Sequence, residues 1–303
     1  MKHSILLIFS LFTVTVFSCK KKTDPVTPVN TSNPEPQLIF KFKFDSTQVR
    51  LDNLGQPSTI PSGHAAQCPV FHSMSAHYIE LSPNDNTALG GGAVLYRAPE
   101  TTAGGSNAID FSQAKLAGQN EVFFSIPLKN VAAGSYKWLR VSLAYQNYDI
   151  KYKYYYTPTS TDYYFTGTLA SFIGFDTYIT SYKINTQTMA INGNKLQGYW
   201  GFETSPLGVT STYEGQTSVT TVPNPLNSSS PIPAGSCVVT GQFANNLVIT
   251  GNETKDVTVV VSLSTNNSFE WNDTSNDGWY QPNAPANETV VDMGIRGLIP
   301  TVQ

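Results

Sequence analysis

The chain has 303 residues, of which 40% are hydrophobic, 12% aromatic and only 13% charged, with a formal net charge of −3. Charged residues form about a quarter of a typical globular chain, so this low share argues against a coiled coil. The small net charge argues against a nucleic-acid-binding protein. The apolar and aromatic content is too high for a chain that is disordered throughout.

The N-terminus predicts export. Lys2 precedes an apolar run over residues 5–17, which is shorter than the roughly 20 residues that span a bilayer and suits the apolar region of a signal peptide. Ser18-Cys19 at the end of this run resembles the lipobox of bacterial lipoproteins. The resemblance implies that Cys19 becomes the new N-terminus and carries acyl chains such as palmitate. Ordinary secretion with an incidental cysteine is the alternative interpretation.

The residues after Cys19 favour the lipoprotein interpretation. Three lysines occupy positions 20–22, and a tract rich in Pro, Thr and Asn continues to residue 37. Such a tract cannot bury apolar surface and is typical of a flexible tether. This arrangement resembles lipoproteins of the Bacteroidota. It implies a protein attached to the cell outer membrane through its lipid, facing either the periplasm or the cell surface.

From residue 38 onward, short β-rich runs alternate with Gly- and Pro-containing turn signals. Residues 39–44 read IFKFKF, an alternation typical of a half-buried strand. Asn192-Gly193 predicts a two-residue hairpin turn. We therefore expect an all-β antiparallel β-sandwich over residues 38–303, either one large sandwich or two closely packed ones divided near 157–162. Further strands are predicted at residues 75–81, 121–126, 136–143, 178–184, 236–243, 246–249 and 257–263.

Three segments carry a family resemblance. They are residues 72–81 (HSMSAHYIEL), residues 123–128 (FFSIPL) and residues 131–143 (VAAGSYKWLRVSL). Their order resembles that of MbnP-like exported lipoproteins over part of the chain. The resemblance implies a β-sandwich and, because some members are associated with copper, a copper-binding function as one alternative.

Histidine, methionine and cysteine gather in one short stretch. His64, His72, Met74 and His77 fall within 14 positions, together with Cys68. Imidazole and thioether ligands suit Cu(I), so these residues form a candidate copper site. In the alternative interpretation, Met74 belongs to the core. Cys68 and Cys237, the two cysteines besides Cys19, form a candidate disulfide in an oxidising compartment.

An acidic turn near the C-terminus is a candidate calcium site. Asp273, Ser275 and Asp277 match the first, third and fifth positions of a calcium-binding loop. Position twelve is Ala284, so the bidentate glutamate of a complete EF-hand is absent. A looser oxygen site for Ca²⁺ is one interpretation, and a turn closed by Asp and Ser side chains without any ion is the other.

Aromatic residues supply a third candidate site. Strand alternation places Tyr152, Tyr154 and Tyr156 on one face, and Trp271 and Trp279 flank the acidic turn. Exposed, these rings would form a platform for sugar rings or for a partner protein. Buried, they would anchor their segments to the core.

Sequence motifs of common enzyme classes are missing. The chain has no G-x-S-x-G, H-E-x-x-H or phosphate-binding P-loop. We therefore predict a non-enzymatic, membrane-anchored lipoprotein with a ligand- or partner-binding body, for which a glycan or a surface protein is the candidate partner. A copper-binding MbnP-like protein is the first alternative. A glycan-active hydrolase is the second, since paired carboxylates leave no spacing rule in sequence.

Overall fold

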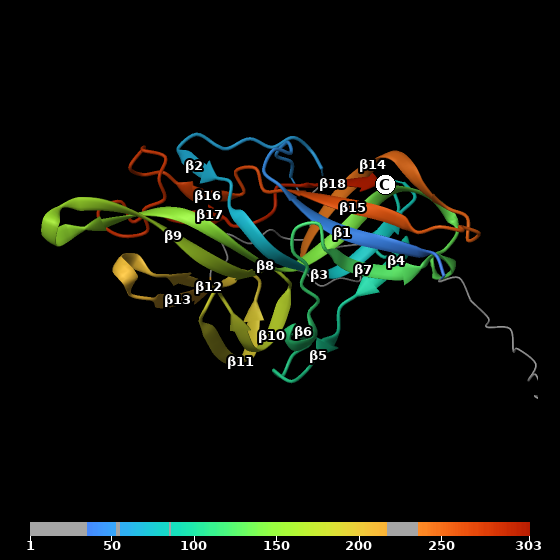
Figure 1. Cartoon of the computed structure of the whole chain (residues 1–303), viewed down its shortest axis with the longest axis horizontal. Helices are drawn as coiled ribbons and strands as arrows, with labels where there is room; N and C mark the ends of the chain where they lie inside the picture. The colour runs from blue at the N-terminus through green and yellow to red at the C-terminus, as the bar shows by residue number, and fades with distance from the viewer. Residues whose placement is uncertain (1–34, 53–54, 85, 217–235) are drawn as a thin grey trace, which may run out of the picture. The chain divides into compact units, whose positions relative to one another are not determined.

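The computed structural model describes residues 35–52, 55–84, 86–216 and 236–303 (Figure 1). The predicted signal peptide, Cys19 and the tether up to residue 34 lie outside the described residues. Within the described ranges, strands are joined by turns and short 3-10 helices, without any α-helix. This confirms the predicted all-β fold. None of the described segments forms a helix long and apolar enough to cross a membrane.

One sheet of the sandwich runs in the order β18-β15-β1-β7. Along β1, Leu38, Phe40 and Phe42 are buried and the residues between them are only half-buried, as the IFKFKF alternation predicts. Strand β1 is antiparallel to β7 but parallel to β15, so the fold is not purely antiparallel. The bounds of these strands are β1 Gln37–Asp45, β7 Val122–Pro127, β15 Val257–Ser264 and β18 Leu298–Val302.

The facing sheet, called the large sheet below, runs in the order β13-β12-β9-β8-β3-β4, and β14 also pairs with β8. Strand β8 is 23 residues long and pairs with β3 along one side. Along its other side it pairs with β14 up to Leu143 and with β9 from Tyr145 onward, so the sheet forks at Ala144. The bounds are β3 Val70–Ser82, β4 Ala93–Arg97, β8 Gly134–Tyr156, β9 Thr161–Phe172, β12 Tyr199–Thr204, β13 Ser211–Gln216 and β14 Cys237–Ile249.

Two smaller sheets complete the body. The sheet β11-β10-β6-β5 packs on β8, β9 and β12 through a second apolar cluster that contains Phe172, Tyr182 and Tyr199. The sheet β17-β16-β2 carries the segments that border the site described below. The bounds are β2 His64–Gln67, β5 Glu100–Thr101, β6 Ala108–Asp110, β10 Asp176–Lys183, β11 Thr188–Leu196, β16 Phe269–Asn272 and β17 Val290–Asp292.

The structure shows where two segments singled out in the sequence lie, the candidate subdivision near 157–162 and the predicted turn at Asn192-Gly193. Residues 157–162 lie at the tip of the β8–β9 hairpin, which extends away from the other strands in Figure 1, and residues Glu35–Gln303 form one compact unit. The predicted hairpin turn at Asn192-Gly193 is wrong, because β11 runs through both residues. Asn192 instead has a φ of 54° at a bulge in the β10–β11 pairing.

The true β10–β11 turn is held by a buried carboxylate. Glu203 of β12 accepts hydrogen bonds from the backbone N–H groups of Asn185, Thr186 and Gln187 at 2.8, 2.9 and 3.0 Å, and from the Thr186 hydroxyl. Burial alone would raise the pKa of Glu203, but these donors lower it below its usual value. The turn therefore depends on Glu203 being ionised.

We expect Glu203→Gln to lower the free energy of unfolding by about 1–3 kcal/mol at about pH 7, because a neutral amide replaces an anion facing three N–H donors. A lowered folded-state pKa gives stability that is present above the unfolded-state pKa and is lost on acidification. The difference between the two proteins should therefore shrink as the pH falls below about 4. Urea unfolding at both pH values measures it.

Glu253 provides the matched control. Its carboxylate also accepts backbone hydrogen bonds, from Thr250 and Gly251, but it lies on the surface. Glu253→Gln should change stability less than Glu203→Gln. Equal losses in the two variants, or a Glu203→Gln loss that does not depend on pH, would contradict the assigned role.

Candidate ligand-binding pocket

A pocket of about 560 Å³ lies between the large sheet and the segment that follows β16. Its volume falls in the range typical of small-molecule sites. Aromatic and aliphatic side chains form most of its lining. From the large sheet and the turn after β12 come Ile150, Tyr152, Tyr154, Leu169, Trp200, Phe202, Thr204, Pro206 and Tyr213, and from β16 and the segment that follows it come Phe269, Tyr280, Pro282, Asn283, Glu288, Thr289, Val290 and Met293.

Strand β12 supplies the centre of the first wall by simple alternation. Trp200, Phe202 and Thr204 line the pocket, while Tyr199 and Glu203 point to the other face of the sheet. Thr204 Oγ1 lies 2.7 Å from the hydroxyl of Tyr152, which is buried and packs edge-on against Phe202 with ring centroids 5.6 Å apart. The hydroxyls of Tyr152 and Thr204 are thus satisfied by each other.

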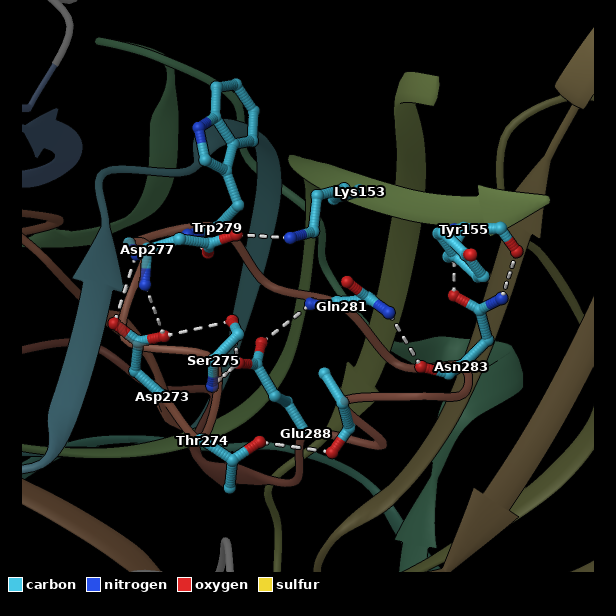
Figure 2. Close-up of polar contacts among 12 residues, drawn as sticks. Lys153, Tyr155, Asp273, Thr274, Ser275, Asp277, Trp279, Gln281, Asn283 and Glu288 are labelled. Atoms are coloured by element: carbon cyan, nitrogen blue, oxygen red, sulfur yellow. Dashed lines mark hydrogen bonds and ion pairs between the residues drawn. The ribbon is translucent and has the colours of Figure 1, made fainter. Parts of the chain in front are cut away.

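The second wall is formed mainly by residues 273–290, called the docked segment below. It lies along the edge of β8 that β3 leaves unpaired. Pairing with β3 ends at Asp149, so the backbone groups of later β8 residues need other partners. The Tyr280 carbonyl accepts a hydrogen bond from Lys153 N at 2.8 Å. The Asn283 amide accepts one from Tyr155 N at 3.2 Å and donates one to Tyr155 O at 2.8 Å (Figure 2). The segment therefore replaces a neighbouring strand.

Nearer to β3, the side-chain amide of Gln67 pairs with the same edge of β8. Gln67 accepts a hydrogen bond from Lys151 N at 2.8 Å and donates one to Lys151 O at 2.7 Å. Lys151, Lys153 and Tyr155 alternate along β8, so their backbone groups all point to the same edge. Side-chain amides thus close an edge that would otherwise be open to another strand.

Glu288 organises the docked segment from within. It is buried, and its carboxylate accepts hydrogen bonds from Ser275 N at 3.1 Å, Ser275 Oγ at 2.8 Å and Gln281 N at 2.8 Å (Figure 2). Among the lining residues that belong to the described part of the chain, Glu288 carries the only carboxylate. Both of its oxygens are committed to the protein's own donors.

The short sheet β17-β16-β2 is fixed by buried ion pairs around Glu270. Its carboxylate contacts Arg50, lies 3.0 Å from Arg296 Nη2 and 2.6 Å from His64 Nδ1, and Arg296 also pairs with Asp292 at 2.7 Å. Burial alone would raise the pKa of Glu270, but His64 and the two arginines lower it. This network holds β16 and β17, which border the pocket.

The residues of the predicted aromatic platform lie in four different environments. Tyr152 and Tyr154 line the pocket, and Tyr156 is exposed farther along the same face of β8. Trp271 is only 1% exposed, packed behind Phe269 and Tyr280, so its assignment to a platform is corrected to the anchoring alternative. Trp279 is partly exposed and packs edge-on against Tyr164, with ring centroids 4.6 Å apart.

The acidic turn is closed by the protein itself. Asp273 accepts hydrogen bonds from Asp277 N at 3.2 Å and Gly278 N at 3.0 Å, and Ser275 bonds to Glu288. Asp277 forms an ion pair with Lys153. Burial alone would raise the pKa of Asp277, but Lys153 and the Trp279 N–H lower it. A lysine ammonium thus supplies positive charge where calcium was predicted, and calcium binding stays a prediction.

The candidate copper ligands are dispersed among separate contacts. His64 Nδ1 faces Glu270, His72 Nε2 lies 3.0 Å from Asp149, and His77 Nε2 lies 2.9 Å from Glu100. Met74 is fully buried in the main core. Over the described ranges, no group of three or more His, Cys, Asp and Glu side chains is arranged to hold a metal ion. Copper binding stays a prediction from the sequence.

The candidate disulfide is not formed, because the two cysteines occupy different environments. Cys68 is exposed, and its Sγ accepts a hydrogen bond from Asn267 N at 3.2 Å. Cys237 is buried, which raises the pKa of its thiol to about 12. Both thiols are free in this structure.

Several pocket residues were not predicted. Trp200 and Phe202 lie on a strand absent from the predictions, although their alternation with Tyr199 and Glu203 was a usable signal. Asn283 and Glu288 lie in an irregular segment, where no periodicity could have identified them. Comparisons with family models, with characterised proteins and with solved structures found no match for this chain.

We expect Asn283→Asp to loosen the docked segment, because the variant keeps an acceptor for Tyr155 N–H but places a carboxylate oxygen against Tyr155 O. Amide hydrogen exchange over residues 273–290 should become about tenfold faster, corresponding to ~1.4 kcal/mol of local stability.

Gln67→Glu is the matched control, since it makes the same chemical change opposite Lys151. Its effect should remain near Lys151 and leave exchange over residues 273–290 unchanged. If Asn283→Asp leaves this segment fully protected, its amide does not hold the pocket wall.

Proposed function

We propose that this chain is an exported binding protein whose pocket takes a neutral ligand with a flat, largely apolar ring face. The observation that carries the proposal is an aromatic pocket in which the one carboxylate of the described lining, on Glu288, is already hydrogen-bonded to Ser275 and Gln281. A concave apolar site with a few polar groups is the usual form of a small-molecule site.

The charge of the lining favours a neutral ligand. None of the described residues that line the pocket is a lysine or arginine, and Glu288 is engaged by the protein's own donors. A charged ligand entering this site would lose hydration without gaining a counter-ion, which is strongly unfavourable. A neutral ligand escapes this penalty.

The shape of the side chains favours rings. Tyr152, Trp200 and Phe202 offer broad faces for van der Waals contact, while Tyr154 and Tyr213 are 38% and 55% exposed. Tyrosines of this kind combine apolar contact with a hydroxyl that can bond to a polar ligand edge. Sugar rings of a glycan, the ligand suggested by the sequence, and neutral aromatic compounds share this chemistry.

The cellular setting of the proposal comes from the sequence. Lipidation of Cys19 would fix the protein to the outer membrane, and the following tract would hold the β-body away from the bilayer. The relation to MbnP-like proteins, the copper-binding alternative and the hydrolase alternative likewise rest on sequence alone. The pocket geometry supports a binding role more directly than any of these.

Calorimetric titration of the mature chain with benzyl alcohol and with a panel of neutral hexasaccharides tests the proposal. Binding of at least one class should show a negative heat-capacity change, the marker of apolar burial. Tyr154→Ala and Tyr213→Ala should each raise the Kd about tenfold, or ~1.4 kcal/mol.

Tyr164→Ala is the control, because Tyr164 is 55% exposed like Tyr213 but lies on the opposite face of the β8–β9 hairpin. It should leave the Kd unchanged. If Tyr164→Ala weakens binding as much as Tyr213→Ala does, the ligand binds outside the pocket. If neither class of ligand binds, the proposal is rejected.

A further inference from the structure

Two pocket rings lie directly over glycines of the neighbouring strands. Gly215 of β13 pairs with Trp200, and a Cβ built on it would meet the indole at 2.5 Å from Cζ2 and 2.8 Å from Cε2. A Cβ on Gly167 of β9 would lie 2.2 Å from Cζ and 2.5 Å from Cε2 of Phe202. These separations are shorter than carbon atoms tolerate, so any larger residue would displace the ring.

Backbone conformation does not explain these glycines. Neither Gly167 nor Gly215 has a positive φ, so an L-residue could adopt either backbone conformation. Glycine inside a strand also lowers stability relative to alanine, and it often marks a place where another group approaches closely. The group that approaches here is in each case an aromatic ring of the pocket.

We propose that Gly167 and Gly215 determine which ligands the pocket admits. By letting Phe202 and Trp200 lie flat against the sheet, they set the depth of the pocket and give it room for a ligand with two adjoining rings. This inference rests on the proposed function, since it assigns the size limit of the same site. A methyl group at either position would lift a ring into the cavity and leave room for a single ring.

The test compares two neutral probes that differ by one ring, benzyl alcohol and 2-naphthalenemethanol, on the mature chain. Gly167→Ala and Gly215→Ala should each raise the Kd of the two-ring probe about tenfold, while the Kd of the one-ring probe changes less than about threefold. If the Kd values of the two probes change equally, or do not change, the size-limiting role is overturned.

Two other glycines serve as controls. A Cβ on Gly201 would lie 2.0 Å from the Tyr182 hydroxyl, in the apolar cluster on the far face of the sheet. Gly201→Ala should therefore lower stability without changing the ratio of the two Kd values. Gly193 of β11 has nothing within 4 Å of a built Cβ, so Gly193→Ala should change neither quantity. A changed ratio in Gly201→Ala would mean that general destabilisation, and not ring seating, controls selectivity.

A compensating variant keeps the test decisive if Gly167→Ala folds poorly. Gly167→Ala combined with Phe202→Leu removes the ring that the methyl group would strike, and it should restore the preference for the two-ring probe. Failure to restore it would overturn the proposal. If the unmodified chain binds neither probe nor any hexasaccharide, the proposed function itself fails. If it binds them but the alanine variants keep the original ratio, only the size-limiting role fails.

Discussion

The exposed edge of β8 is the constraint on which the rest of the site depends. This strand outruns its partner β3 at Asp149, and its later N–H and C=O groups must be paired or left to water. Gln67, Asn283 and the Tyr280 carbonyl supply the pairing, so that residues distant in sequence become a substitute strand. The pocket exists because this substitute strand stands opposite the aromatic face of β8 and β12.

Buried charge gives the irregular segments a defined position. Glu288 and Glu270 each bind donors from more than one place in the chain, whereas Glu203 binds the donors of a single turn, and none of the three is left with an unpaired carboxylate. Removing one partner of such a group leaves a charge that has lost its hydration, which is costly. These carboxylates therefore act as fixed points for loops that have little apolar surface of their own, and the pocket keeps a wall that is not a strand.

Aromatic residues have two roles in this protein, and the sequence alone does not show which residue has which role. Some rings, such as Trp271, stabilise the body from inside, and others, such as Tyr154 and Tyr213, border space that a ligand can enter. Trp200 and Phe202 belong to both groups, because they pack on the sheet and line the pocket. Gly215 and Gly167 beneath them let the two rings pack closely on the sheet, and the cavity therefore stays open.

The sequence by itself determined the all-β class, the alternation of β1 and the shared face of Tyr152 and Tyr154, because a two-residue period is a local property of a strand. It did not determine the β11 bulge at Asn192, since a positive φ serves a bulge as well as a hairpin turn. Nor could it indicate that Asn283 would reach Tyr155, or that Lys153 would pair with Asp277. Those contacts join segments more than a hundred residues apart, and only the tertiary structure decides which strand edge is left open and which loop covers it.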